Sequence, residues 1–69
     1  MNAAEMINII RIAFAGRQIV GRIGIIRENG LWNVIARVRN ANGQGIRHEV
    51  LCAVEDVALA VDVRRHLMA

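Results

Sequence analysis

The dipeptide Asn29-Gly30 restricts the fold of this chain more than any other feature. Asn-Gly between apolar, β-branched segments is the strongest short-range signal for a two-residue hairpin, because both turn residues need positive φ angles. After the turn, apolar Trp32, Val34, Ala36 and Val38 alternate with Asn33, Ile35, Arg37 and Arg39. This alternation predicts a half-buried strand over residues 31–39, with Trp32 facing the interior and Arg37 and Arg39 facing the opposite way.

Two further strands are predicted on either side of this one. Residues 17–27 are rich in β-branched side chains, and Gly21 and Gly24 would each cost a helix about 1 kcal/mol. A second turn signal, Asn-Ala-Asn-Gly at 40–43, precedes a third strand over residues 44–51. The three segments predict an antiparallel meander.

Helices are predicted at both ends of the chain. Residues 3–15 begin after Asn2, a favourable N-cap, with Glu5 in the capping-box position and Gly16 as a stop. The expected apolar stripe of this helix is Met6, Ile9, Ile10, Ala13 and Phe14. Residues 54–67 are predicted as the second helix, because their apolar residues return to helical spacing, and acidic residues lead it and basic residues end it. The predicted fold is α+β, a single domain of residues 1–69 with both helices on one face of the sheet.

The hydrophobic content predicts self-association. Of the 69 residues, 55% are hydrophobic, which is more than a domain of this size easily buries, since it hides only roughly 60% of its unfolded surface. Large contiguous apolar patches are seldom left exposed. We therefore expect a homodimer, with the contact on the last helix, which is apolar around much of its circumference.

The sequence predicts a cytoplasmic protein that does not enter membranes. Its apolar stretches are interrupted well before the ~20 residues that a bilayer span requires. Glu5, Asn8 and Arg11 interrupt the apolar stretch near the N-terminus, so a secretion signal is not expected. The single cysteine, Cys52, forbids an internal disulfide and fits a reducing compartment.

Five residue types are absent from the chain: Lys, Ser, Thr, Tyr and Pro. Their absence removes hydroxyl nucleophiles, a lysine Schiff base and a tyrosine acid from the available chemistry. We therefore expect no enzymatic activity. The restricted alphabet also leads to the hypothesis that the sequence was deliberately simplified or designed as a scaffold without a native activity.

The residues that remain form no predicted catalytic or metal site. His48 and Cys52 are four residues apart, so a regular strand would place them on one face about 13 Å from each other, too far for a base and its nucleophile. Two histidines and one cysteine lack the paired spacing of a metal site. No glycine-rich phosphate loop occurs. We expect no metal, cofactor or small-molecule substrate.

All nine basic residues, not counting histidine, are arginines, and the net charge is +3. Because side chains alternate along a strand, Arg22 and Arg47 are expected to join Arg37 and Arg39 on the sheet face that points away from the helices. An arginine-rich sheet face is suited to phosphate contacts and to the major groove of DNA. The alternative is a solvated face on which arginine provides solubility, with Glu49 among the arginines.

Three motifs follow one another along residues 23–66: Gly30-Leu31-Trp32, Ala36-Arg37-Val38 and the stretch Glu55-Asp56-Val57-Ala58-Leu59-Ala60-Val61-Asp62. With these motifs the segment resembles the ethylene-response-factor type of DNA-binding domain, which is related to domains of integrases and homing endonucleases. The resemblance implies a sheet lying in the major groove, with Arg27 and Arg37 as contacts and Trp32 beside them. Ile25 and Ile35 depart from the family, because plant members have an arginine and an acid there.

The predicted nucleic-acid-binding residues are therefore Arg22, Arg27, Trp32, Arg37, Arg39 and Arg47. A second class of function stays open, since small inhibitors such as type I-F anti-CRISPR proteins also use a compact sheet with helices, and they bind a protein surface. In such a module Ile25, Ile35 and the apolar last helix would form the contact.

Overall fold

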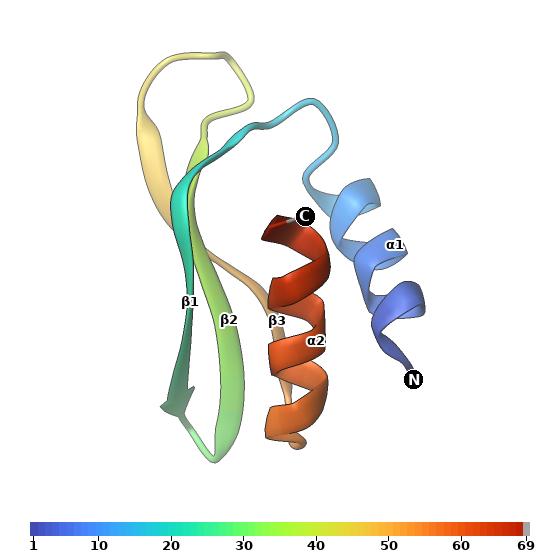
Figure 1. Ribbon diagram of the computed structural model, residues 1–69. Coiled ribbons are helices and arrows are strands. Elements are labelled where there is room, and N and C mark those ends of the chain that lie inside the picture. The colour runs from blue at the N-terminus through green and yellow to red at the C-terminus, as the bar shows by residue number, and fades with distance from the viewer. Residues whose placement is uncertain (69) are drawn as a thin grey trace.

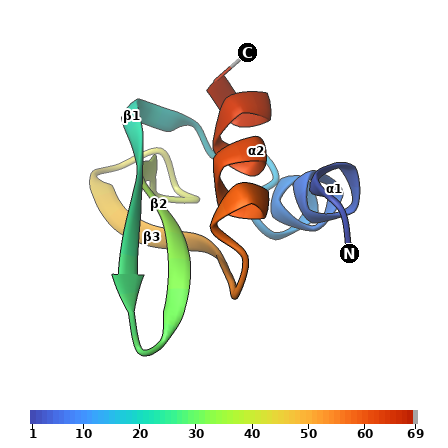
Figure 2. The same cartoon turned by 60° about the horizontal axis from the view of Figure 1, so that its bottom comes forward.

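The computed structural model describes residues 1–68 and confirms the predicted α+β fold (Figure 1). Its elements are α1 (Ala3–Ala13), β1 (Ile19–Glu28), β2 (Leu31–Arg39), β3 (Ile46–Val54) and α2 (Val57–Met68). The strands form one antiparallel sheet in the order β1-β2-β3. Helix α2 lies against one face of the sheet, and α1 packs on α2 and also contacts β3 (Figures 1 and 2). The other face carries no helix and is called the open face below.

The β1–β2 hairpin has the geometry that Asn29-Gly30 predicts. Both residues have positive φ angles, 54° at Asn29 and 75° at Gly30. Glu28 pairs with Leu31, so the loop between the strands is two residues long. A turn with two positive φ angles has a backbone twist that matches the right-handed twist of the flanking strands. Type I or type II turns would force the two strands apart.

The alternation along β2 separates the core from the open face. Val34 and Val38 are fully buried, and the half-buried Trp32 packs against the same core opposite Val54. The buried core consists of Ile7, Ile10, Ile23, Val34, Ala36, Val38, Leu51, Val54, Ala60 and Val63. Trp32 thus faces the helices, as predicted, and Arg37 faces away from them.

Helix α1 begins as predicted, and part of the predicted stripe faces the core, because Met6, Ile10 and Phe14 lie in or against it. Asn2 is the N-cap, and its side-chain oxygen accepts the Glu5 backbone N–H at 2.9 Å. Ile7 and Ile10 are buried, whereas Ile9, placed in the predicted stripe, is 48% exposed. Isoleucines lie on several sides of this helix, so its contact with α2 determines which of them face the core. It also ends at Ala13 instead of residue 15, with Phe14 as the C-cap.

The third strand begins and ends later than the predicted residues 44–51, and the last helix starts later. β3 continues to Val54, which lies opposite Trp32, where the sequence had predicted helix from residue 54. The helix begins at Val57, and the Asp56 carboxylate accepts the Ala58 backbone N–H at 2.8 Å, which satisfies a free donor of the first turn. Val54 fits the apolar pattern of the strand and also that of the helix. Its pairing with Trp32 therefore decides that it belongs to the end of β3.

Helix α2 is covered on two sides. Ala60 and Val63 are fully buried, Leu59 and Leu67 pack against the core, and α1 supplies contact that the sheet alone does not provide. The apolar circumference that led us to place a dimer contact on this helix is thus used largely inside one chain. Among residues 1–68, no helix combines the length and the apolar character needed to cross a bilayer.

Candidate nucleic-acid interface

The candidate site lies on the open face, where the strand register brings distant residues together. Arg37 pairs with His48 across β2 and β3, and Gly24 pairs with Ile35 across β1 and β2. Directly opposed residues of antiparallel strands point to the same face. By this rule the open face consists of Val20, Gly24, Ile26, Glu28, Leu31, Asn33, Ile35, Arg37, Arg39, Ile46, His48, Val50 and Ala53.

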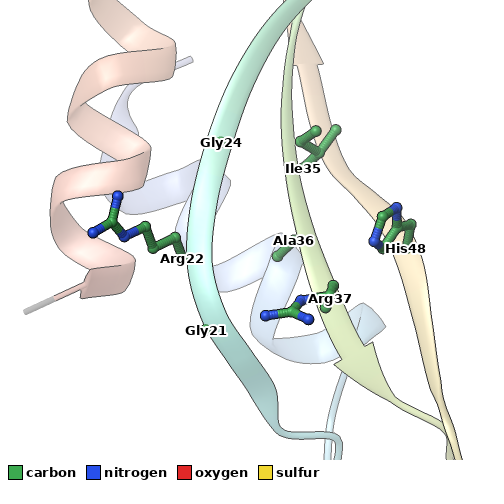
Figure 3. A pocket seen from close by; sticks show the side chains of 7 residues that line it. All are labelled: Gly21, Arg22, Gly24, Ile35, Ala36, Arg37 and His48. Atoms are coloured by element: carbon green, nitrogen blue, oxygen red, sulfur yellow. The ribbon is translucent and has the colours of Figure 1, made fainter.

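A hollow of about 500 Å³ lies on this face. It is lined by Gly21, Arg22, Gly24, Ile35, Ala36, Arg37 and His48 (Figure 3). The register of β1 and β2 shifts between Val20 and Gly24, and Gly21 within this irregularity has a φ angle of 78°. Gly21 and Gly24 have no side chain to fill this side of the hollow, which leaves room over the β1 backbone.

The guanidinium group of Arg37 lies over Gly21. Figure 3 shows the Arg37 side chain extending from β2 toward β1, and a Cβ atom at residue 21 would come within 2.7 Å of its terminal nitrogen. In the described chain, neither Arg37 nor His48 has a side-chain hydrogen bond or an ion pair. Their donors are free for a ligand, and a guanidinium group binds phosphate or carboxylate oxygens in a two-pronged geometry.

Arg22 and Arg39 flank this arrangement. Arg22 lines the hollow, but its side chain extends from the outer side of β1, away from β2 (Figure 3). Arg39 alternates with the buried Val38, so it shares the open face with Arg37. Three of the six predicted residues, Arg22, Arg37 and Arg39, therefore lie on or beside the open face.

The other three predicted residues lie on the helix-bearing face, and for Arg47 this corrects the sequence prediction, which had placed it on the open face. Arg47 lies opposite the buried Val38, so it starts from the helix-bearing face. Arg27 lies opposite Trp32, and its guanidinium carbon is 5.1 Å from the centre of an indole ring. Arg27 and Trp32 form a cation–π pair on the helix-bearing face near the hairpin, and they do not join Arg37.

Glu49, expected among the arginines, also lies on the helix-bearing face, opposite Ala36. Its carboxylate is 3.7 Å from Arg17, whose Nε donates to the Arg39 carbonyl oxygen at 2.9 Å. The guanidinium group of Arg17 also lies over the Phe14 ring at 5.3 Å. Arg17 thus ties the α1–β1 connection to the sheet, and the Glu49 carboxylate lies on the opposite face from Arg37 and His48.

The rest of the open face is mostly apolar, with Glu28 and Asn33 as its polar residues toward the β1–β2 hairpin. Ile26, Ile46 and Val50 are 41%, 44% and 55% exposed. Ile25, which the sequence grouped with Ile35 as a contact for a protein partner, lies opposite Val34 and packs against the core. Ile25 and Ile35 therefore lie on opposite faces of the sheet and cannot serve one flat contact.

His48 and Cys52 do not share a face, contrary to the prediction. The β2–β3 register shifts between Val34 and Ile35, so Leu51 is an extra residue that moves Cys52 to the core side, opposite Val34. Burial raises the pKa of the Cys52 thiol, an effect that a hydrogen bond with the Val34 backbone partly opposes. Within residues 1–68, no three His, Cys, Asp or Glu side chains come together as metal ligands.

Sequence reasoning missed three features of the hollow: the role of His48 and the glycines at 21 and 24. The period-two pattern could have placed His48 beside Arg37, because both alternate with core positions on adjacent strands. The irregularity in β1 has no such signal, since two glycines in a strand do not reveal where its register shifts. No family model, curated protein or solved structure matches the chain.

Proposed function

We propose that this chain is a non-enzymatic module that binds double-stranded DNA through the open face. The observation that carries the proposal is the unpartnered guanidinium group of Arg37 over the glycine side of the hollow, with His48 next to it. A DNA phosphate is the chemical group that this arrangement would accept, because it can take two hydrogen bonds from one guanidinium group. Arg22 and Arg39 would provide further phosphate contacts beside it.

The side chains of the open face favour a duplex over single strands. Proteins that bind unpaired bases stack them on aromatic side chains. The two aromatic residues of this chain, Phe14 and Trp32, both pack against the core on the helix-bearing side. The open face therefore offers charge and an exposed sheet surface but no aromatic stacking surface, which suits contact with the backbone and groove of a duplex.

Salt titration tests this proposal directly. We expect a short mixed-sequence duplex to bind with a dissociation constant on the order of 10⁻⁴–10⁻⁶ M at physiological salt and more tightly at low salt. Three arginine–phosphate contacts predict a slope of roughly −2.7 for log affinity against log salt, about −0.9 for each contact. Fluorescence anisotropy of a labelled duplex between about 50 and 200 mM salt measures both quantities. The absence of binding at low salt would refute the proposal.

Replacing Gly21 with alanine should weaken this binding. The new Cβ would displace the terminal nitrogen of Arg37, which lies 2.7 Å from that position. The positive φ angle of 78° also strains alanine, by about 1–2 kcal/mol. We expect a lower melting temperature together with a lower duplex affinity, measured by circular dichroism and by anisotropy.

Gly43→Ala is the matched control for Gly21→Ala. Gly43 has nearly the same φ angle, 77°, and no atom within 4 Å of a Cβ at that position. Alanine at residue 43 should therefore destabilise the fold by a similar amount without moving Arg37. If both variants lose the same affinity, the loss comes from instability, and the Arg37 position over Gly21 plays no part in binding.

The exposed apolar residues of the open face favour a second candidate, a protein-interaction module. Ile46 and Val50 are about half exposed and lie near His48 on the same strand. An apolar contact of this kind depends little on salt, whereas phosphate contacts depend on it strongly. A partner protein bound with little salt dependence, together with no affinity for duplex DNA, would favour this candidate. If the chain binds neither duplex DNA nor a partner protein, the hypothesis of a scaffold without a native activity is favoured.

A further inference from the structure

The sheet has two unpaired edges, the outer edges of β1 and β3. Each of these strands is irregular at one point, between Val20 and Gly24 in β1 and at Leu51 in β3. β3 pairs with β2 without interruption from Ile46 to Val50. A regular edge strand presents unpaired N–H and C=O groups, which a further strand can pair with.

The hydrogen-bond pattern of the ladder shows which β3 residues direct their backbone groups outward. The Asn40 N–H donates to the Gly45 carbonyl oxygen at 3.0 Å, so these residues form a hydrogen-bonded pair just beyond the strands. Hydrogen-bonded and non-hydrogen-bonded pairs alternate along an antiparallel ladder. Arg47 and Glu49 therefore direct their backbone groups toward β2. The residues that direct theirs outward are Ile46, His48 and Val50.

The side chains of this segment are complementary to themselves. Residues 46–50 read Ile-Arg-His-Glu-Val, an order of apolar, cationic, imidazole, anionic and apolar groups around His48. If the segment pairs antiparallel with a second copy centred on His48, Ile46 lies opposite Val50 of that copy. Arg47 then lies opposite Glu49 of the second copy, and the two His48 residues face each other. Every pair is apolar, oppositely charged or identical.

The backbone geometry agrees with this register. A pairing centred on His48 uses the outward groups of residues 46, 48 and 50 as its hydrogen-bonded pairs. Arg47 and Glu49 then form the non-hydrogen-bonded pairs, whose Cα atoms are closest, at about 4.5 Å, which favours oppositely charged side chains. Ile46 and Val50 are 44% and 55% exposed in the single chain and would lose part of that exposure.

We infer that the β3 edge pairs with the β3 edge of a second copy of this chain, with His48 on the two-fold axis. The result is a continuous sheet with three strands from each copy. Opposed side chains share a face, so both open faces lie on one side of the joined sheet. This inference does not rest on DNA binding, although it would place two Arg37 groups on one surface.

Cysteine cross-linking tests the register. In a Cys52→Ala background, His48→Cys should form a disulfide-linked dimer under mild oxidation, because hydrogen-bonded partners have Cα atoms about 5.5 Å apart. Val50→Cys is the control on the same exposed edge. Its two copies would be about 14 Å apart along the strands, beyond the reach of a disulfide. Equal cross-linking of both variants, or none by His48→Cys, would overturn the inference.

A charge swap gives a second, independent measurement. Arg47→Glu places two carboxylates opposite each other at both ends of the pairing, and we expect the dimer dissociation constant to rise roughly tenfold in sedimentation equilibrium. Arg47→Glu with Glu49→Arg restores opposite charges and should restore association. Melting curves show whether loss of the Arg17–Glu49 ion pair unfolds the double variant. A wild-type chain that stays monomeric at high concentration, or a folded double variant without recovery, would also reject the pairing.

Discussion

Val34→Asp should unfold the protein. Val34 has no exposed surface, lies at the centre of β2 and has no cation near it in the core, which holds only hydrophobic side chains among the described residues. Burying an unpaired carboxylate costs several kcal/mol. A core of this size rarely provides more than about 3–5 kcal/mol of stability. Far-UV circular dichroism and amide NMR spectra should show a chain without cooperative structure at neutral pH.

Ile35→Asp is the matched control, one residue further along the same strand. Ile35 lines the hollow on the open face, so its aspartate would be solvated. We expect a folded protein with a modest loss of stability, within about 1 kcal/mol, since aspartate is poorly suited to strands. The new carboxylate beside Arg37 should also reduce duplex affinity. If Ile35→Asp unfolds the chain and Val34→Asp does not, the assignment of the buried and open faces of β2 is wrong.

The contrast between these positions shows why β2 could be predicted from the sequence. Strict alternation from Trp32 to Arg39 leaves only one face that can be buried, and Asn29-Gly30 fixes where the strand begins. The same rule failed for Arg47, because the prediction assigned its face without the β2–β3 pairing. The register places Arg47 opposite the buried Val38.

Irregular pairing explains the other differences. Leu51 is an extra residue in β3, and one extra residue reverses the face of everything beyond it, which separates Cys52 from His48. A bulge changes no residue type, so hydrophobicity and propensity cannot reveal it. In α1, four isoleucines point in several directions, and contact with α2 selects Ile7 and Ile10 for burial. The hollow could not be predicted from the sequence either, because it forms where β1 departs from regular pairing with β2.

Arg37→Ala with Arg39→Ala should remove most of the duplex affinity and leave the fold intact. Two of three proposed phosphate contacts are lost, so the salt slope should fall from roughly −2.7 to roughly −0.9. Affinity at low salt should drop at least about tenfold, since a hydrogen bond to a charged group contributes about 1.5 kcal/mol or more. The melting temperature should change little, because Arg37 is exposed and has no partner in the described chain.

Arg11→Ala with Arg65→Ala separates contact from net charge. Both arginines are exposed on helices, on the far side of the sheet from the open face, and their removal lowers the net charge by the same amount. If affinity depends only on overall charge, the two double variants lose it equally. If the open face is the contact surface, the salt slope falls only for Arg37→Ala with Arg39→Ala, because counterions are released only where arginines meet phosphates. The slope is therefore the more decisive measurement, since it counts contacts independently of stability.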